Sequence, residues 1–210
     1  ETGYSAQIRR CGYFFVLTRP EDAAAFRAQR PLWDGLGIRT EWLNGDEVRS
    51  RLPLMRYEDA VAGVWGPDDG LADPGAVVQG YVSAASRLGA RLLTGVEVTG
   101  IKAAKGRVEG VVTAAGTIAA GRVLNAAGAW AGLVGRMAGV DIPIVPVKRQ
   151  IQVTAAVPEV PADFPFVSDY AGSFYFHREG PGLLLGWSDP GQAPGFDQTL
   201  DEDSEFAHLE

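Results

Sequence analysis

The chain has 210 residues, of which 46% are hydrophobic, and it contains five tryptophans, nine phenylalanines and six tyrosines. This is enough apolar material for one substantial core or two smaller ones, so we expect a soluble globular protein. The formal net charge is -7 and the sequence contains no run of lysines and arginines, which argues against nucleic acid or an anionic lipid surface as a partner.

The cysteine count and the hydropathy pattern exclude further classes. Cys11 is the single cysteine, so no disulfide can form within the chain, and no Cys/His cluster offers zinc ligands. No stretch of about 18 apolar residues could cross a membrane, and residues 1–4 lack a signal-peptide pattern. We therefore expect no metal, no membrane insertion and a cytoplasmic location. Because the first residue is not methionine, we also expect an internal piece of a longer protein.

The first third of the chain predicts alternating strands and helices. Residues 12–18 form a short apolar and aromatic run that is typical of a buried strand. The alanine-rich segment 21–36 predicts a helix, and a second short helix is expected over 45–52. Residues 61–65 predict another strand.

The strongest helix signal begins at Asp73. This carboxylate can cap a helix and precedes Pro74, whose fixed backbone angle suits the first helical position. Apolar residues then recur at helical spacing as far as Leu88, and Gly89 is a typical residue just past a helix end. We therefore predict a helix over 74–88.

The middle of the chain changes to strands after this helix. Three short strands separated by glycine turns form a predicted β-meander, at 96–101, 108–113 and 117–119. Residues 123–127 predict a further strand, which turns at Gly128 into a helix over 129–138. A strand-turn-helix of this kind is typical of a layered α/β sheet.

Beyond Pro143 the pattern predicts antiparallel strands separated by proline and glycine turns, at 145–154, 166–168, 173–178 and 183–187. We predict no helix among these strands, and the acidic tail 197–210 could begin one. The expected fold class is therefore α/β plus antiparallel β.

Six short motifs follow one another along the chain in an informative order. They are Gly-Leu-Ala-Asp-Pro (70–74), Gly-Val-Glu-Val-Thr-Gly-Ile (95–101), Asn-Ala-Ala-Gly-Ala-Trp (125–130), Pro-Val-Lys-Arg-Gln (146–150), Tyr-Phe-His-Arg-Glu-Gly (175–180) and Leu-Leu-Leu-Gly-Trp (183–187). Each motif is weak evidence alone. Their order and spacing resemble the D-amino-acid oxidase superfamily, in particular its branch of sarcosine oxidase, glycine oxidase and dimethylglycine dehydrogenase.

The resemblance implies a partial FAD-binding domain, with its β-meander, joined to a large, mostly antiparallel substrate-domain sheet. Residues 1–70 and 143–210 would belong to the substrate domain, truncated at the C-terminus, and residues 71–142 to the FAD-binding domain. It also implies that the parent protein oxidises the C–N bond of a small amino acid or N-methyl amino acid by hydride transfer to flavin. An electron acceptor, a partner subunit or a second copy of the chain could be partners.

Five residues would lie against FAD if the resemblance holds. Val98 would touch the adenine half through its backbone, and the run Ala127, Gly128, Ala129 and Trp130 would lie near the pyrophosphate and ribityl chain. Small residues suit this place because a backbone approaches a dinucleotide closely only where side chains are absent. Judged alone, Val98 would be a strand core residue and Gly128 an ordinary turn.

Three residues are the catalytic candidates, Arg149, Tyr175 and His177. Arg149 would bring a positive charge near the flavin and stabilise its anionic reduced form, whereas Lys148 is equally well explained as a solvated side chain. Tyr175 would line the substrate pocket or else pack as a core aromatic. His177, two residues further, would project from the same face. It could handle protons, although a lone strand histidine is more often structural.

Two departures from the family pattern shape the functional expectation. Monomeric sarcosine oxidases carry a lysine and a histidine where this chain has Leu184 and Ser188, and the lysine is associated with oxygen activation, so a dehydrogenase is favoured. The sequence also lacks the Gly-x-Gly-x-x-Gly fingerprint that holds a dinucleotide diphosphate. We therefore expect this piece alone to bind FAD weakly or not at all and to be inactive. Alternatives are a non-catalytic binding or assembly module and an FAD-dependent dehydrogenase of a hydroxy compound such as glycerol 3-phosphate.

Overall fold

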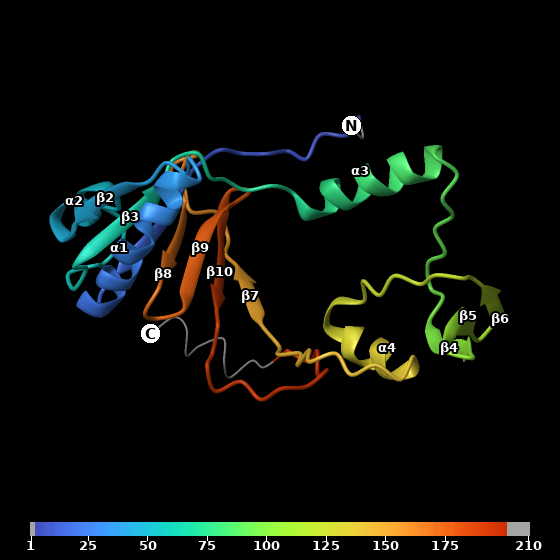
Figure 1. Ribbon diagram of the computed structural model, residues 1–210. Helices are drawn as coiled ribbons and strands as arrows, with labels where there is room; N and C mark the ends of the chain where they lie inside the picture. Colours follow the sequence, from blue (N-terminus) through green and yellow to red (C-terminus); the bar gives the residue numbers. More distant parts are fainter. Residues whose placement is uncertain (1–2, 201–210) are drawn as a thin grey trace. The chain divides into compact units, whose positions relative to one another are not determined.

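The computed structural model describes residues 3–200, which form two compact units (Figure 1). The first unit comprises residues 3–84, 149–190 and 200, and the second comprises residues 85–148 and 191–199. The first unit is thus built from segments far apart in the sequence. The domain boundaries expected from the sequence stay a prediction.

A seven-stranded mixed sheet is the framework of the first unit, with the strand order β2-β3-β1-β8-β9-β10-β7. Its strands are β1 (Tyr13–Leu17), β2 (Glu41–Asn44), β3 (Ala62–Gly66), β7 (Gln150–Val153), β8 (Phe166–Asp169), β9 (Phe174–Glu179) and β10 (Gly182–Trp187). The pair β1 and β8 is parallel, and every other neighbouring pair is antiparallel. The predicted strands at 12–18, 61–65, 166–168, 173–178 and 183–187 are confirmed.

The predicted strand over 145–154 is wrong in its first half, because regular pairing begins only at Gln150. Pro143 and Pro146 lack the backbone N–H that a ladder needs, and residue 147 forms only an isolated bridge to residue 194. The sequence also failed to indicate β2. This strand has four residues and lies at the edge of the sheet, so it lacks the long apolar alternation that would reveal it.

The two faces of the sheet are packed differently. On one face, the side chains of Phe14, Val16 and Val167 are fully buried in the main core. Val48 and Leu52, which lie outside the sheet, are also fully buried in this core. On the other face, helix α1 (Pro20–Gly35) packs on the half of the sheet formed by β1, β3 and β2. Both helices expected in this part of the chain are confirmed.

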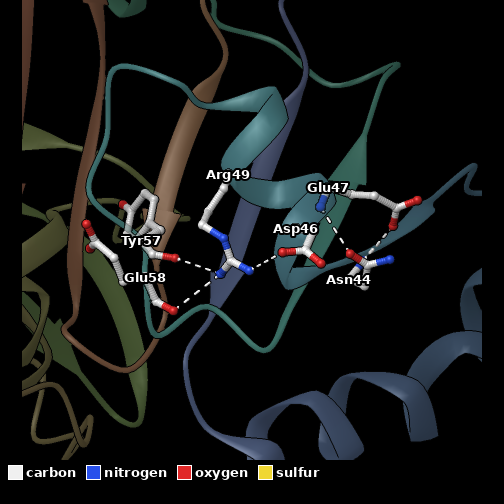
Figure 2. Close-up of polar contacts among 6 residues, drawn as sticks. All are labelled: Asn44, Asp46, Glu47, Arg49, Tyr57 and Glu58. Atoms are coloured by element: carbon white, nitrogen blue, oxygen red, sulfur yellow. Dashed lines mark hydrogen bonds and ion pairs between the residues drawn. The ribbon is translucent and has the colours of Figure 1, made fainter.

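Helix α2 (Gly45–Arg51) is capped, and tied to the loop before β3, by the polar contacts that Figure 2 shows. The Asn44 side chain accepts a hydrogen bond from the Glu47 amide at 3.0 Å, and the Glu47 carboxylate accepts one from the Asn44 amide at 2.7 Å, which forms a capping box. Arg49 donates to the Asp46 carboxylate and to the carbonyls of Tyr57 and Glu58. One guanidinium therefore ties the helix to the loop before β3.

Helix α3 (Pro74–Arg87) begins as the sequence predicts. The Asp73 carboxylate accepts a hydrogen bond from the Ala76 amide at 2.9 Å, which satisfies one of the free donors of the first turn. After the helix, Gly89 has a φ of 89°, a left-handed backbone that favours glycine.

The second unit contains the predicted β-meander and a short helix. Its strands β4 (Val98–Ala104), β5 (Arg107–Thr113) and β6 (Gly116–Ala119) pair antiparallel in chain order. Lys105 and Gly106 both have positive φ, as the tight turn between β4 and β5 requires. A single 3-10 turn, Gly128–Trp130, then leads into α4 (Ala131–Met137), close to the predicted helix.

The strand predicted over 123–127 is wrong. Among the described residues no strand pairs with this segment, and Leu124 is 90% exposed. A lone extended segment without a neighbour leaves its backbone donors and acceptors to water, so an apolar pattern alone does not make a strand. No helix among residues 3–200 has the length and apolar character to cross a membrane. The helix suggested for the tail lies mainly outside the described residues.

Candidate functional site

The sheet of the first unit carries an aromatic face, which we define as Tyr13, Phe166, Tyr175 and His177. Tyr13 and Phe166 are register partners on β1 and β8, and their rings stack with centroids 4.4 Å apart. The Phe166 ring also stacks with Tyr175 at 5.5 Å and with His177 at 5.4 Å. Tyr175 and His177 therefore project from the same face, as strand periodicity predicts.

The His177 imidazole contacts the backbone of the next residue in its own strand, β9. The side chain is almost fully buried, and Nδ1 lies 3.0 Å from the Arg178 carbonyl oxygen. A carbonyl oxygen can only accept, so Nδ1 carries the proton in this contact and Nε2 is the acceptor nitrogen of the neutral ring. The geometry thus supports the structural role considered for His177, with Nε2 as its acceptor nitrogen.

A groove of about 600 Å³ adjoins His177 within the first unit, and Arg9, Asp73, Glu179 and Leu184 contribute to its lining. The Arg9 guanidinium donates to the Arg178 carbonyl at 2.6 Å, so this cation is engaged by the strand that carries His177. Leu184 lies directly opposite His177 in the β9–β10 pairing. The position matching the family's lysine therefore lies beside the aromatic face.

Tyr13 is a member of this face that the sequence did not single out. Its pKa is raised by burial, while a hydrogen bond from Ser168 lowers it and the nearby Tyr175 and Asp69 raise it further. Two phenols therefore lie near each other on the same surface. No spacing rule connects residue 13 with residue 175, and the one available signal was the aromatic run of the first strand.

Arg149 and Lys148 fall in different units. The exposed Arg149 side chain donates to the Asp189 carbonyl at 3.4 Å. Lys148 is 15% exposed, and its ammonium lies 2.9 Å from the Asp197 carboxylate and 2.9 Å from the Thr199 carbonyl. Lys148 is therefore a paired cation of the second unit rather than an ordinary solvated side chain.

The second unit contains a mainly apolar cavity of about 470 Å³ between β4, β5 and α4. Three of the five residues expected to contact a cofactor line it, namely Val98, Ala127 and Trp130. Gly128 and Ala129 lie in the adjoining turn and are exposed. Gly128 has a φ of 53° and open space where a Cβ would stand, so its backbone is accessible.

Asn125 fixes the loop that carries these small residues. Its side-chain amide donates to the Ala131 carbonyl at 2.9 Å, and its Oδ1 accepts from the Ala127 amide at 3.2 Å. The sequence placed Asn125 in a motif but gave it no role. An Asn two residues before a run of small residues is a signal for this kind of side-chain turn.

Known proteins are similar to this chain over nearly its whole length. Residues 1–210 match the family model described as FAD dependent oxidoreductase. Dimethylglycine dehydrogenase from Rattus norvegicus is 31% identical over 96% of this chain and 25% of its own length, and glycine oxidase from Geobacillus kaustophilus is 29% identical over 90% and 50%.

Solved structures of related proteins have a similar fold. L-proline dehydrogenase from P. horikoshii superposes with a TM-score of 0.86 at 29% identity, covering 99% of this chain and 56% of that chain. Glycine oxidase from Geobacillus kaustophilus gives a TM-score of 0.78 at 27% identity, over 96% and 53%. The chain thus spans between a quarter and a little over half of these relatives.

Proposed function

Since the chain belongs to the FAD-dependent oxidoreductase family, we propose that the protein containing it oxidises the C–N bond of a small amino acid or N-methyl amino acid. Relatives named for dimethylglycine, sarcosine and glycine support this substrate class. The structural observation that most supports flavin-dependent chemistry is the gathering of Val98, Ala127 and Trp130 around one cavity, since these residues come from separate motifs of the family pattern.

The cavity of the second unit would hold part of a flavin nucleotide. FAD, when bound, supplies the acceptor for the substrate hydride. Val98, Ala127 and Trp130 would hold it along the mainly apolar cavity. Gly128 and Ala129 would let the backbone approach the phosphates, because the left-handed Gly128 has no side chain in the way.

The aromatic face would receive the substrate. The Tyr175 phenol would donate a hydrogen bond to a substrate oxygen or nitrogen, with the Tyr13 phenol nearby as a second polar group. Nε2 of His177 would accept a proton, since Nδ1 is used by the Arg178 carbonyl. Arg149 would supply positive charge toward the reduced cofactor.

We infer a dehydrogenase rather than an oxidase, which implies a separate electron acceptor. Leu184 opposite His177 puts an apolar side chain where the family's oxygen-activating lysine would stand. Relatives with dehydrogenase names are consistent with this reading. A cytoplasmic location stays a prediction, because several of these relatives are named as mitochondrial.

The test is anaerobic reduction of the full-length, flavin-loaded protein. Dimethylglycine, sarcosine, glycine and proline are added in turn, with glycerol 3-phosphate as the hydroxy comparison, and flavin bleaching is recorded before air is admitted. Bleaching by an amine with slow return of colour in air is the expected result. Bleaching by glycerol 3-phosphate alone would select the hydroxy-compound dehydrogenase. A full-length protein without bound flavin would favour the binding module.

A further inference from the structure

Gly186 on β10 faces Tyr175 on β9 directly in the strand register. A Cβ built on Gly186 would lie 2.2 Å from Tyr175 Cζ, 2.3 Å from its hydroxyl oxygen and 2.6 Å from Cε1. The three nearest atoms thus all belong to one side chain. The Tyr175 ring occupies the space that any other residue at position 186 would fill.

The backbone does not explain why a glycine stands at this position. Gly186 is outside the left-handed region, and its strand is paired on both sides, with Tyr175 of β9 and with Ile151 of β7. Glycine inside a strand is unfavourable because it loses more conformational freedom and packs no side chain. The close approach of the Tyr175 ring is therefore the physical reason for the glycine.

We propose that Gly186 is a positioning residue that sets the height of the Tyr175 phenol above the sheet. The ring is stacked against Phe166, with centroids 5.5 Å apart and planes 14° apart, while Gly186 leaves room for the phenol end. This ring position rests on geometry alone. Its value for catalysis rests on the proposed function, in which the phenol binds the amine substrate.

The variant Gly186→Ala is informative because the atoms it meets are the far end of a side chain and not backbone. The ring can move away while the strand stays paired, so the variant should fold with a displaced phenol. A matched control is Gly100→Ala, a strand glycine whose added Cβ would meet Val112 at an ordinary 3.5 Å. The control tests what alanine does in a strand without a ring above it.

The first measurement uses ¹⁹F NMR on the full-length protein with 3-fluorotyrosine at position 175. Gly186→Ala is expected to shift this resonance, and Gly100→Ala is expected to leave it in place. An unchanged resonance in Gly186→Ala would overturn the proposal. This readout needs no turnover, so it stands even if the protein fails to oxidise amines and the proposed function falls.

The second measurement is a kinetic cycle in the flavin-loaded protein. A phenol displaced by about 1 Å is expected to lower kcat/KM roughly 10- to 100-fold in Gly186→Ala. Tyr175→Phe should cause a similar loss, and the double variant should lose no more than Tyr175→Phe alone. If the two losses multiply instead, Gly186 acts independently of the phenol and is a packing residue only.

Discussion

The ammonium of Lys148 lies 2.9 Å from the carboxylate of Asp197, and this contact joins the stretch before β7 to a segment that follows β10 in the chain. The Lys148 hydrogen bond lowers the pKa of Asp197 to about 2, with smaller contributions from the backbone and side chain of Thr199. The pairing can therefore be tested by measuring the pKa of Asp197.

Lys148→Met should move the Asp197 pKa from about 2 upward toward its ordinary 3.8. Because the Asp197 pKa is lowered in the folded state, the pair stabilises the fold above pH 3.8, and this stabilisation is lost as the pH falls toward 2. The variant should therefore be less stable than wild type at neutral pH, and the two stabilities should converge in acid. Carboxyl ¹³C NMR measures the titration. The control Lys102→Met removes a different lysine–carboxylate pair, that of Lys102 with Glu109. It should leave the Asp197 pKa unchanged.

Asn125→Ala should loosen the loop over 125–131. The variant loses two hydrogen bonds, each worth about 1 kcal/mol in a typical protein, and the small residues would no longer be fixed beside the cavity. We expect a lower flavin content in the full-length protein, measured by absorbance after gel filtration. Asn125→Asp should be worse, because a carboxylate oxygen would face the Ala131 carbonyl. Wild-type flavin content in both variants would contradict the role given to Asn125.

Ser168→Ala should raise the pKa of the Tyr13 phenol further, because the Ser168 hydrogen bond is the interaction that lowers it. Stability that depends on the neutral phenol is present below pH 10 and is lost as the pH rises through the folded pKa. The difference in ultraviolet titration between each protein and its Tyr13→Phe counterpart isolates this group. The exposed Ser50→Ala serves as a control, and a shift of equal size there would refute the assignment.

Arg49→Ala should destabilise the first unit more than Asn44→Ala does. Loss of the Asn44 cap typically costs about 1 kcal/mol. Loss of Arg49 frees the Tyr57 and Glu58 carbonyls as well as the Asp46 carboxylate (Figure 2). Urea unfolding followed by tryptophan fluorescence measures both. Arg30→Ala breaks the exposed pair with Asp34 and should change stability by less than about 1 kcal/mol.

Local signals predicted the parts of the fold that depend on local physics. The helix after Asp73 follows from a cap and a proline, and the meander follows from the turn at Lys105 and Gly106. The failures share another cause. Residues 123–127 have a strand pattern but no partner strand among the described residues, and strand β2 forms without such a pattern because β3 provides its partner.

The parts of the candidate site that could be predicted are those carried by short, continuous sequence motifs. Val98, Ala127 and Trp130 came from the resemblance, and the structure gathers them at one cavity. The places of Tyr13, Ser168 and Gly186 beside Tyr175 depend on strand order and register, which no local sequence pattern encodes. The catalytic roles of Arg149, Tyr175 and His177 stay predictions.

The parallel pairing of β1 with β8 has a consequence for biosynthesis. Tyr13 is synthesised before its neighbour Phe166, which is made only after all of α3, the meander and α4. Until then the apolar strand β1 has an open edge, which is a template for wrong pairing with other chains. We expect slow folding with long-range closure, and chains terminated before β8 should be more prone to aggregation than chains terminated after β10.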